Sequence, residues 1–407
     1  MTAISLDCPI AVVGAGIAGL SAAIALHHEG FRDIRVLERG SIDTTGGFGL
    51  NLSPTAVGIL DRLGVLEQIR GNFVESRHLV LRAADGSTLW RQPRRHEGAN
   101  FPHISLIRGE LIGGLLRALE RLIGPDRILQ GHEYDGCDNY ARPTCVFARS
   151  KGHYKELPAH VIIGADGLQS RVRRDLHPFE GAPRQFPMDV WRGVASMSSY
   201  VQPSEMLVHG LVGARLVTYP VLLRDDQLYV NWVAAFSPEH HADQLCPDDE
   251  RQIRASLATF YRSWEIRGFD VGELFAETPN VRHQSLRDRD PLWWWGMGNS
   301  IVLGDAAHPM LPMGSSGATQ AVIDAPAFAG ALSRTLDVRS SVKVFHELRR
   351  SHLHRLQLLN RVMGPERIID EYYSRLPESL EVNGSLCSTE RAEIGREYHL
   401  AATAGSD

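Results

Sequence analysis

Three glycines near the N-terminus have a spacing that can hold a phosphate-containing cofactor. Gly14, Gly16 and Gly19 form a G-x-G-x-x-G turn at the end of the apolar run 9–14, and helical spacing follows. Gly14 permits the tight bend, Gly16 lets a pyrophosphate approach the backbone, and Gly19 lets the helix pack close to the strand. The unpaired N–H groups of the helix N-terminus then face the phosphates. The pattern predicts a dinucleotide seat.

An acidic residue follows at the position that such a seat requires. Glu38 ends a second strand-like segment, 34–38, which completes a β-α-β unit and places a carboxylate within reach of a ribose hydroxyl pair. This unit alone does not distinguish FAD from NAD. Only one G-x-G-x-x-G is present, so no second seat for a resident nicotinamide is expected. The other cofactor contacts predicted in this part of the chain are Ala15, Ala18, Gly49 and, on the adenine side, Arg39.

A second turn motif follows another apolar run. Residues 161–163 lead into Gly164-Ala165-Asp166-Gly167, and a short basic segment comes next. Two interpretations of Asp166 stay open from the residues alone. Its carboxylate either contacts a cofactor or bonds local backbone N–H groups in a strand-to-helix turn.

A third motif carries a carboxylate far from the first, directly after the strand-like run 300–303. An extended FAD needs a second polar contact remote from its adenine end, and Asp305 can bind the ribitol hydroxyls. Gly317 and Ala318 lack bulk and begin a helical pattern, so an isoalloxazine ring can rest against backbone N–H groups there. The positive end of that helix would stabilise negative charge on the reduced ring. The predicted contacts in this segment are Asp305, Pro312, Gly317 and Ala318.

These motifs need a parallel sheet and its helices to position them. The predicted fold class is α/β with two domains: a Rossmann-like FAD-binding domain, an inserted antiparallel-sheet substrate domain and a helical C-terminal segment. Alternating runs at 216–219 and 228–232 predict the inserted sheet, with one face over a pocket. The predicted boundaries are 1–72, 101–180 and 281–340 for the FAD-binding domain, 73–100 and 181–280 for the sheet domain, and 341–407 for the helical segment.

Composition excludes several other classes of protein. The 407 residues are 43% hydrophobic and 22% charged, with a formal net charge of -5, which is typical of a soluble globular chain. The basic clusters 91–95 and 171–174 are short and predicted to be solvated surface, so no nucleic-acid partner is expected. Cysteines at 8, 137, 145, 246 and 387 form no metal-binding spacing. Without an export signal or an apolar run of roughly 18 residues, a cytoplasmic protein with no membrane span is expected.

In combination the motifs resemble the group A flavoprotein monooxygenases, which share the fold of 4-hydroxybenzoate hydroxylase. The resemblance covers most of the chain and rests on G-A-G-I-A-G-L at 14–20, Arg108 in I-R-G-E-L, G-A-D-G at 164–167 and G-D-A-A-H-P-M-L-P-M-G at 304–314. It implies that Arg108 contacts the ribityl-phosphate region of FAD and that Asp166 serves FAD and NAD(P)H binding. The sequence departs from the family pattern at 323–326, where Pro326 is expected to kink or restart the helix.

The resemblance also implies an activity. Members of the family reduce FAD with NADH or NADPH, form a flavin C4a-hydroperoxide with O₂, and hydroxylate an aromatic or heteroaromatic small molecule, in some cases with decarboxylation. The phrase W-R-G-V at 191–194 is similar to phenazine-hydroxylating members, and salicylate hydroxylases are almost as similar in the flavin motifs. The alternatives are a related flavoenzyme, such as an epoxidase or halogenase, and a non-catalytic flavin-binding module.

Two residues on one predicted strand are the candidates for substrate chemistry. The resemblance assigns Tyr219 the activation of a phenol, and the alternative is a half-buried sheet tyrosine with a satisfied hydroxyl. Arg215 lies four residues earlier on the same strand face, where it could hold a carboxylate bidentately; the alternative is a surface arginine. Trp191 and Trp232 either line an aromatic pocket or pack in the core.

Overall fold

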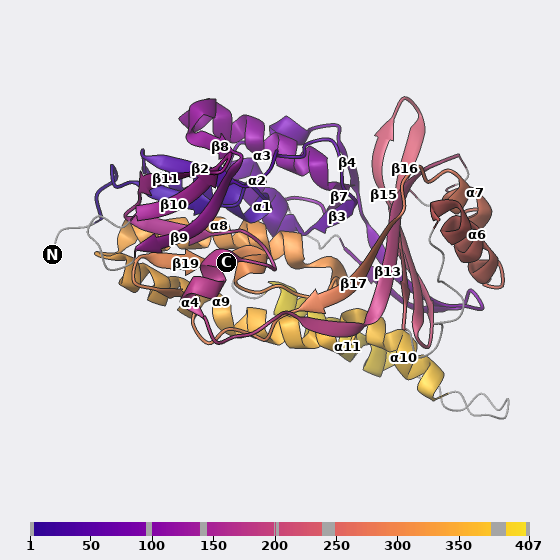
Figure 1. The fold of residues 1–407 in the computed structure, drawn as a ribbon. Coiled ribbons are helices and arrows are strands. Elements are labelled where there is room, and N and C mark those ends of the chain that lie inside the picture. The colour runs from indigo at the N-terminus through magenta and orange to yellow at the C-terminus, as the bar shows by residue number, and fades with distance from the viewer. Residues whose placement is uncertain are drawn as a thin grey trace.

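A six-stranded sheet forms the centre of the first lobe (Figure 1). The computed structural model describes residues 4–94, 100–138, 145–198, 200, 203–237, 249–375 and 388–403. The strand order is β18-β19-β12-β1-β2-β8, parallel except for the β18–β19 pair. β1 and β12 are fully buried, as expected for apolar strands covered on both faces. The strands are β1 (Ile10–Val13), β2 (Ile34–Glu38), β8 (Ile128–Gln130), β12 (Val161–Gly164), β18 (Gly296–Met297) and β19 (Ser300–Val302).

Three helices pack together on this sheet. α1 (Ile17–His28) contacts both α3 (Arg108–Ile123) and α8 (Gly317–Arg334). Most of α1 is buried because its small alanine-rich surface fits between two neighbours. α8 runs as one helix through Pro326, so the predicted restart at that residue is wrong, although the proline forfeits one helical hydrogen bond.

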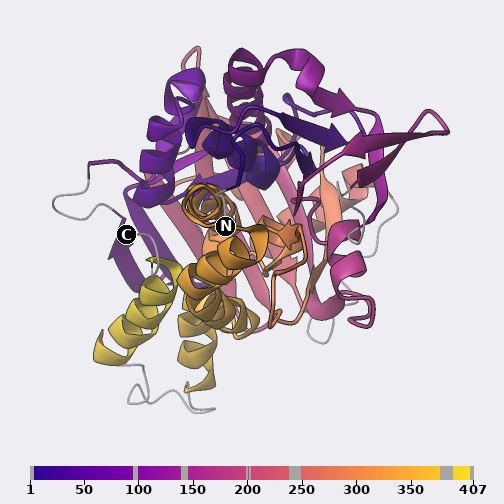
Figure 2. The ribbon, with the colours of Figure 1, turned by 90° about the vertical axis from the view of Figure 1, so that its left-hand side faces the viewer.

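A seven-stranded sheet forms the second lobe, in the order β17-β13-β16-β15-β14-β5-β6. Neighbouring strands are antiparallel except β5 and β14, which run parallel. Figure 2 shows this broad sheet behind the helices of the first lobe. The strands are β5 (His78–Ala83), β6 (Thr88–Pro93), β13 (Arg184–Met197), β14 (Glu205–Leu211), β15 (Ala214–Arg224), β16 (Gln227–Phe236) and β17 (Arg282–Asp288).

Different elements pack on the two faces of the seven-stranded sheet. Helices α6 (Glu250–Tyr261) and α7 (Val271–Ala276) cover one face with an aromatic core (Figure 1). Trp191 and Trp232 belong to this core, and Trp232 Nε1 donates to Thr278 Oγ1 at 2.8 Å. These tryptophans therefore pack in the core rather than line a pocket. The opposite face packs against α10 (Arg367–Ser374) and against the first lobe.

Smaller elements complete the described chain. Two three-stranded sheets have the orders β3-β7-β4 and β11-β10-β9. Their strands are β3 (Gly49–Leu52), β4 (Phe73–Glu75), β7 (Ile104–Ile107), β9 (His132–Asp138), β10 (Cys145–Ser150) and β11 (His153–Pro158). The remaining helices are α2 (Pro54–Arg62), α4 (Arg171–Leu176), α9 (Val338–Arg361) and α11 (Ser388–Thr403). Short 3-10 turns are η1 (Leu66–Ile69), η2 (Pro125–Arg127), η4 (Gly304–Ala306), η5 (Met313–Ser315) and η6 (Gly364–Glu366).

The predicted fold class is confirmed, and one segment needs reassignment. The parallel sheet, the inserted sheet and the C-terminal helices are all present. However, β17 falls within the range 281–340 predicted for the FAD-binding domain, and it pairs with β13 in the seven-stranded sheet. The chain therefore returns to the first lobe only after β17.

Candidate active site

The three sequence motifs lie together at the carboxyl ends of strands β1, β12 and β19 of the six-stranded sheet. The register aligns Val13 of β1 with Gly164 of β12, and Gly164 with Val302 of β19. Backbone hydrogen bonds continue beyond the strands, since Ala165 N donates to Val13 O (2.7 Å) and Leu303 N donates to Gly164 O (2.9 Å). In open parallel sheets, ligands bind outside these carboxyl ends.

The first turn has the shape that a pyrophosphate needs. Gly14 has a φ of +104°, and a Cβ there would lie 2.5 Å from Ala165 O. A Cβ at Gly19 would lie 1.9 Å from Gly14 O, whereas a Cβ at Gly16 would meet nothing within 4 Å. The free space beside Gly16 therefore lies at the N-terminus of α1, where backbone N–H groups favour an anion. The residues of this turn fit a dinucleotide phosphate.

Glu38, the last residue of β2, is fixed at the same turn. Its Oε2 accepts a hydrogen bond from Ala15 N and its Oε1 accepts one from Gly40 N, both at 3.0 Å. This position at the strand end is the one from which a carboxylate binds ribose hydroxyls. Arg39 follows with an exposed side chain.

Small residues let the three motifs approach one another. Ala18 of α1, Ala165 of the second motif and Ala321 of α8 form an apolar cluster. A Cβ at Gly304, which has a φ of +55°, would lie 2.7 Å from Ala18 Cβ. Any larger side chain at these positions would push the third motif away from the glycine turn.

Asp305 lies in the turn directly beyond β19, and its side chain is exposed. Surrounding protein nevertheless desolvates the carboxyl and raises its pKa, while His308 and Arg108 act in the opposite direction. The Asp305 carboxyl therefore has solvent on one side and protein on the others, a position called a recess below. Arg108 begins α3, and its backbone N donates to Phe48 O at 3.0 Å. A carboxylate and a guanidinium that interact at this recess suit the hydroxyls and phosphate of a ribityl-phosphate chain.

The carboxylate of Asp166 is used locally. Its Oδ1 accepts from Ser170 Oγ at 2.5 Å and its Oδ2 accepts from Arg171 N at 2.7 Å, which satisfies the free N–H groups at the start of α4. Burial raises the pKa of Asp166, whereas these hydrogen bonds lower it. The structure thus shows the strand-to-helix turn, and a role of Asp166 in FAD or NAD(P)H binding stays a prediction.

Two other predicted contacts differ in their surroundings. Gly317 begins α8 and Ala318 follows in its first turn, as the sequence predicts. Gly49 begins β3 and packs against the second lobe, where its N donates to Asn231 Oδ1 at 2.7 Å. A Cβ at Gly49 would lie 2.6 Å from Asn231 Cβ, so this packing already accounts for the glycine.

Residues from the C-terminal helices hold the loop that precedes α8. Gly314 has a φ of +72°, and a Cβ there would lie 2.2 Å from the Tyr398 hydroxyl oxygen. Tyr398 donates to Met313 O at 2.9 Å and lies 3.0 Å from Ser316 Oγ. Burial raises the pKa of Glu366 to about 7, opposed by Arg215 and the Gly314 backbone N–H. The loop is thereby fixed from α11 and η6.

A pocket of about 300 Å³, called the Arg94 pocket below, adjoins this loop. Its walls come from β3, the end of β6, α8 and α11, and include Asn51, Arg94, Ser316, Thr319 and Tyr398. Arg94 is only 8% exposed. The prediction that the 91–95 cluster is solvated surface is therefore wrong for this residue, and Arg95 lies outside the described residues. Sequence reasoning missed Arg94, Asn51 and Tyr398, because their burial depends on elements distant in the chain.

The second basic cluster, 171–174, is also partly buried. Arg173 is 1% exposed, and its Nη1 donates to Ala306 O at 3.0 Å and Ala307 O at 2.9 Å. Arg173 therefore ties α4 to the turn that contains Asp305, and the prediction of a solvated cluster is wrong here as well.

Tyr219 is not among the residues that line the Arg94 pocket, although Arg94 and Asn51 of its wall both influence the phenol. Burial raises the pKa of its phenol strongly, while Arg192, Arg94 and Asn51 oppose that rise. The hydroxyl is therefore protonated at neutral pH. It can donate a hydrogen bond, but it does not act as a phenolate base.

Arg215 shares a strand face with Tyr219, but it has a different partner from the one predicted. The guanidinium is 1% exposed and lies 2.5 Å from Asp370 Oδ1 of α10, and it also donates to Leu211 O and Ala214 O. Its charge is already neutralised by a carboxylate. The predicted role of holding a substrate carboxylate does not fit this geometry.

A buried network of charged and polar side chains is centred on Asp324 of α8. Asp324 accepts from Arg349 Nε at 3.0 Å and from Gly304 N at 3.0 Å, and it lies 2.6 Å from His308 Nε2. Burial alone would raise the pKa of Asp324, but His308 and Arg349 outweigh it and hold the pKa at about 2. This network joins α8 and α9 to the turn carrying Asp305.

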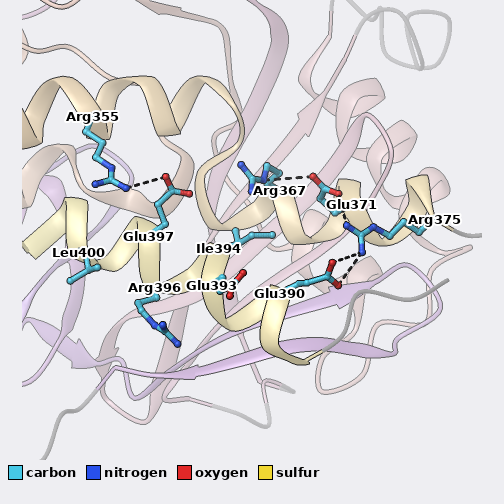
Figure 3. Close-up of a pocket in the computed structure, with 10 residues that line it drawn as sticks. All are labelled: Arg355, Arg367, Glu371, Arg375, Glu390, Glu393, Ile394, Arg396, Glu397 and Leu400. Atoms are coloured by element: carbon cyan, nitrogen blue, oxygen red, sulfur yellow. Dashed lines mark hydrogen bonds and ion pairs between the residues drawn. The ribbon is translucent and has the colours of Figure 1, made fainter. Parts of the chain in front are cut away.

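A larger pocket, of about 460 Å³, lies between α9, α10 and α11 and is called the α9–α11 pocket below (Figure 3). It is lined by four arginines and four glutamates. Arg355 pairs with Glu397 at 3.2 Å, and Arg375 pairs with Glu390 at 2.9 Å and with Glu371 at 3.6 Å. Its charges are balanced and largely paired within the pocket.

Two other kinds of feature are absent from the residues that the structure describes. None of its helices has both the length and the apolar character needed to span a bilayer. No cluster of metal-ligating side chains occurs among the residues that the structure describes, and Cys246 and Cys387 lie outside them.

Comparison with known proteins identifies the family. The FAD binding domain family matches residues 7–356. This chain belongs to that family. It is 32% identical over 352 residues to phenazine 1,6-dicarboxylic acid hydroxylase PhzS of Lysobacter antibioticus, covering 84% of this chain and 86% of the relative. It is 31% identical over 353 residues to 3-amino-4-hydroxybenzoate 2-monooxygenase of Streptomyces cremeus, covering 84% of this chain and 83% of the relative.

Solved structures show the same fold at lower identity. Klebsiella pneumoniae HpxO complexed with FAD and uric acid superposes with a TM-score of 0.75 at 20% identity, over 97% of each chain. Pseudomonas aeruginosa PqsL with 2-aminobenzoylacetate gives 0.72 at 20% identity, over 88% of this chain and 99% of that one. Family and relatives confirm the predicted group A FAD-dependent monooxygenase, with FAD as cofactor and NAD(P)H as co-substrate.

Proposed function

We propose that this protein hydroxylates an aromatic or heteroaromatic small molecule in the Arg94 pocket, using NAD(P)H and O₂. The observation that carries the proposal is the position of the pocket. Its wall includes Gly314, Ser315 and Ser316, the residues directly before α8 in the motif that begins at Asp305. The relatives named above act on phenazine and aminohydroxybenzoate acids, which supports a flat, conjugated substrate.

The residues at the sheet edge would bind the cofactor in an extended form. When bound, FAD supplies the redox chemistry between NAD(P)H and O₂. The glycine turn and Glu38 would hold the adenosine diphosphate, and Asp305 and Arg108 would hold the ribityl phosphate. The N-terminus of α8 favours negative charge at the adjacent ring edge. The roles of Ala15, Ala18, Arg39, Gly49, Asp166, Pro312, Gly317 and Ala318 as cofactor contacts are part of this proposal.

Around the substrate, the chain's task is to exclude water and to fix orientation. Leu52, Pro54 and Leu79 contribute apolar wall, while α11 closes the pocket with Tyr398 and Ala402. Tyr219 would act indirectly, by orienting the Asn51 side chain at the pocket wall for a phenolic or enolic substrate. We also propose a cytoplasmic location and no nucleic-acid partner, on the composition of the chain.

The test uses the purified FAD-loaded protein. With a true substrate, NAD(P)H oxidation should accelerate and one atom of ¹⁸O₂ should appear in the product. Parallel assays with NADH and NADPH identify the electron donor, and CO₂ release reports decarboxylation. The same product formed under strictly anaerobic conditions would contradict monooxygenation. A bound flavin that NAD(P)H never reduces, with or without candidate substrates, would support a non-catalytic flavin-binding protein instead.

The cofactor placement has its own test. Asp305→Ala removes the carboxylate from the recess, and a hydrogen bond to a charged group contributes about 1.5–3 kcal/mol, so FAD should bind roughly 10- to 100-fold more weakly. Absorbance of bound flavin after gel filtration measures this. Asp85→Ala, in a turn of the second lobe, is the control and should retain full FAD. Unchanged occupancy in Asp305→Ala would contradict the placement.

A further inference from the structure

The long helix α9 carries large apolar side chains on two of its sides. On one side, Val342, Phe345 and Leu353 are buried against the first lobe. The side chains on the other side are between 37% and 52% exposed, and they are Val344, Leu348, Leu358 and Val362. A helix that is apolar on both sides is normally covered on both sides.

The exposed side chains follow the spacing of a seam between two helices. Positions 344, 348, 351, 355, 358 and 362 are separated alternately by four and three residues. This heptad spacing keeps one stripe of a helix facing a partner helix. We call these six positions the α9 seam. Its two polar members, Ser351 and Arg355, are also exposed.

Helix α11 lies beside the α9 seam and widens the apolar surface. Arg355 pairs with Glu397 of α11 at 3.2 Å (Figure 3), and Leu400, one turn further along α11, is 56% exposed. Single exposed apolar side chains are common on soluble proteins, whereas a contiguous row of them marks an interaction site. The α9 seam together with Leu400 forms such a row.

Charges beside the seam indicate which partner fits it. Glu347 lies four residues before Ser351, and Arg355 lies four residues after it. Val344 and Leu358 are each seven residues from Ser351. If a second α9 lies antiparallel about a two-fold axis at Ser351, Glu347 faces the partner's Arg355 and Val344 faces the partner's Leu358. The seam is therefore complementary to a second copy of itself.

Both charged side chains are available for this contact. The ion pair of Glu347 with Lys343 is loose, at 3.9 Å, and both side chains are more than 60% exposed. Arg355 uses Nη2 for Glu397, which leaves further N–H donors on its guanidinium. An anionic lipid surface fits the row less well, because Glu347 lies beside its centre and the whole chain has a net charge of -5.

We propose that α9 forms the contact surface of a symmetric homodimer, in which two α9 seams pack antiparallel with Ser351 on the two-fold axis. The 24 residues of α9 extend over about 36 Å, which accommodates the whole seam. Stable interfaces bury about 1,200–2,000 Å², and a contact of two helices per subunit lies near the lower end. We therefore expect a dimer that dissociates at micromolar concentration. The proposal does not depend on the substrate or on the reaction.

Sedimentation velocity of the FAD-loaded full chain, from about 1 to 100 µM, measures the association. The wild type should change from monomer to dimer within this range. Leu348→Asp buries a carboxylate near the axis in each copy and should weaken the dimer at least about 10-fold. Leu223→Asp is the matched control, because Leu223 is 58% exposed on β15 of the second lobe. This control should associate as the wild type does.

Charge reversal tests the antiparallel order of the two helices. Glu347→Arg alone brings like charges together across the axis and should weaken the dimer roughly 5-fold or more. Combination of Glu347→Arg with Arg355→Glu restores opposite charges and should recover most of the association. A role of these residues within one subunit would not produce this recovery.

A cysteine on the axis tests the geometry directly. Ser351→Cys brings two thiols close enough for a disulfide in the proposed arrangement, so mild oxidation should yield a covalent dimer. Ser263→Cys, exposed just after α6, and the wild type with its native cysteines give the background of cross-linking.

Four results would overturn the proposal. These are a wild type that stays monomeric over this concentration range, a Leu348→Asp variant that associates normally, a double charge reversal without recovery, and a Ser351→Cys variant that cross-links no more than the background. A monomer that sediments with phosphatidylglycerol vesicles would identify the row as a membrane contact instead. FAD content and thermal unfolding show that each variant is folded.

Discussion

Two pockets in the described part of the chain differ in how their charged side chains are paired. The α9–α11 pocket is the larger, but its arginines and glutamates balance and largely pair with each other (Figure 3). The Arg94 pocket is smaller and holds a buried guanidinium with neutral partners. A pocket that satisfies its own charges has little electrostatic reason to bind a ligand, whereas a pocket that leaves one unsatisfied gains from binding one. The pairing of charged side chains in a pocket is thus a better guide to ligand binding than the volume of the pocket.

The largest effect is expected where a buried arginine loses its carboxylate. Asp324→Asn leaves the buried Arg349 without the carboxylate that neutralises it, so the free energy of unfolding should fall by about 3–5 kcal/mol. Urea denaturation with bound FAD measures this. Glu347→Gln is the control, because that side chain is 65% exposed in its ion pair with Lys343 and should lose less than about 1 kcal/mol. Equal losses of unfolding free energy in the two variants would contradict this expectation, since burial of an ion pair would then make no difference.

A pH effect of nearly this size is expected at Glu366, beside the Arg94 pocket. Its folded-state pKa is about 7, raised by burial from an ordinary 4.5. The stability contributed by the protonated form is fully present below about pH 4.5 and is lost as the pH rises through 7. The loss approaches about 3 kcal/mol at 1.36 kcal/mol per pKa unit. Glu366→Gln should remove it, so unfolding curves of the variant and wild type should diverge between pH 5 and 8. Parallel curves would contradict a buried, titrating Glu366.

A smaller effect of opposite sign is expected at Arg94 itself. Arg94→Met removes a buried charge that lacks a carboxylate, so the substrate-free protein should gain about 1–2 kcal/mol of stability. Thermal unfolding without substrate measures this. The matched substitution Arg349→Met deprives Asp324 of a partner and should instead destabilise the protein. A loss of stability in Arg94→Met as large as in Arg349→Met would identify Arg94 as a structural residue.

The smallest effect is expected in the α9–α11 pocket. Arg375→Ala removes an ion pair between partly exposed side chains, and such pairs contribute about 0.2–1 kcal/mol. FAD content and substrate turnover should stay at wild-type values. A large loss of turnover would show that this pocket takes part in the reaction and would reverse the comparison.

The sequence predicts the parts of the site that depend on local chain geometry. The glycine turn, Asp305 after a strand and Gly317 at a helix start each follow from a few adjacent residues and their dihedral needs. Arg215 could not be interpreted in this way, because its partner Asp370 is 155 residues away. Arg94 was misjudged for a similar reason: its cluster looks solvated until β3, β14 and α11 close around it. Charge alone does not reveal burial, which is decided by long-range packing.

The large sequence separation between β12 and its neighbour β19 has a consequence for folding. β1 is followed directly by the glycine turn, but β12 acquires its outer neighbour only when Ser300–Val302 joins the sheet. Contacts of such high sequence separation form slowly, because loop closure must precede them. Until then the β12 edge is an unpaired apolar template that can associate with another chain. Binding of the cofactor by Asp305 and α8 is therefore a late event in folding, and free FAD during refolding should favour the native structure over aggregation.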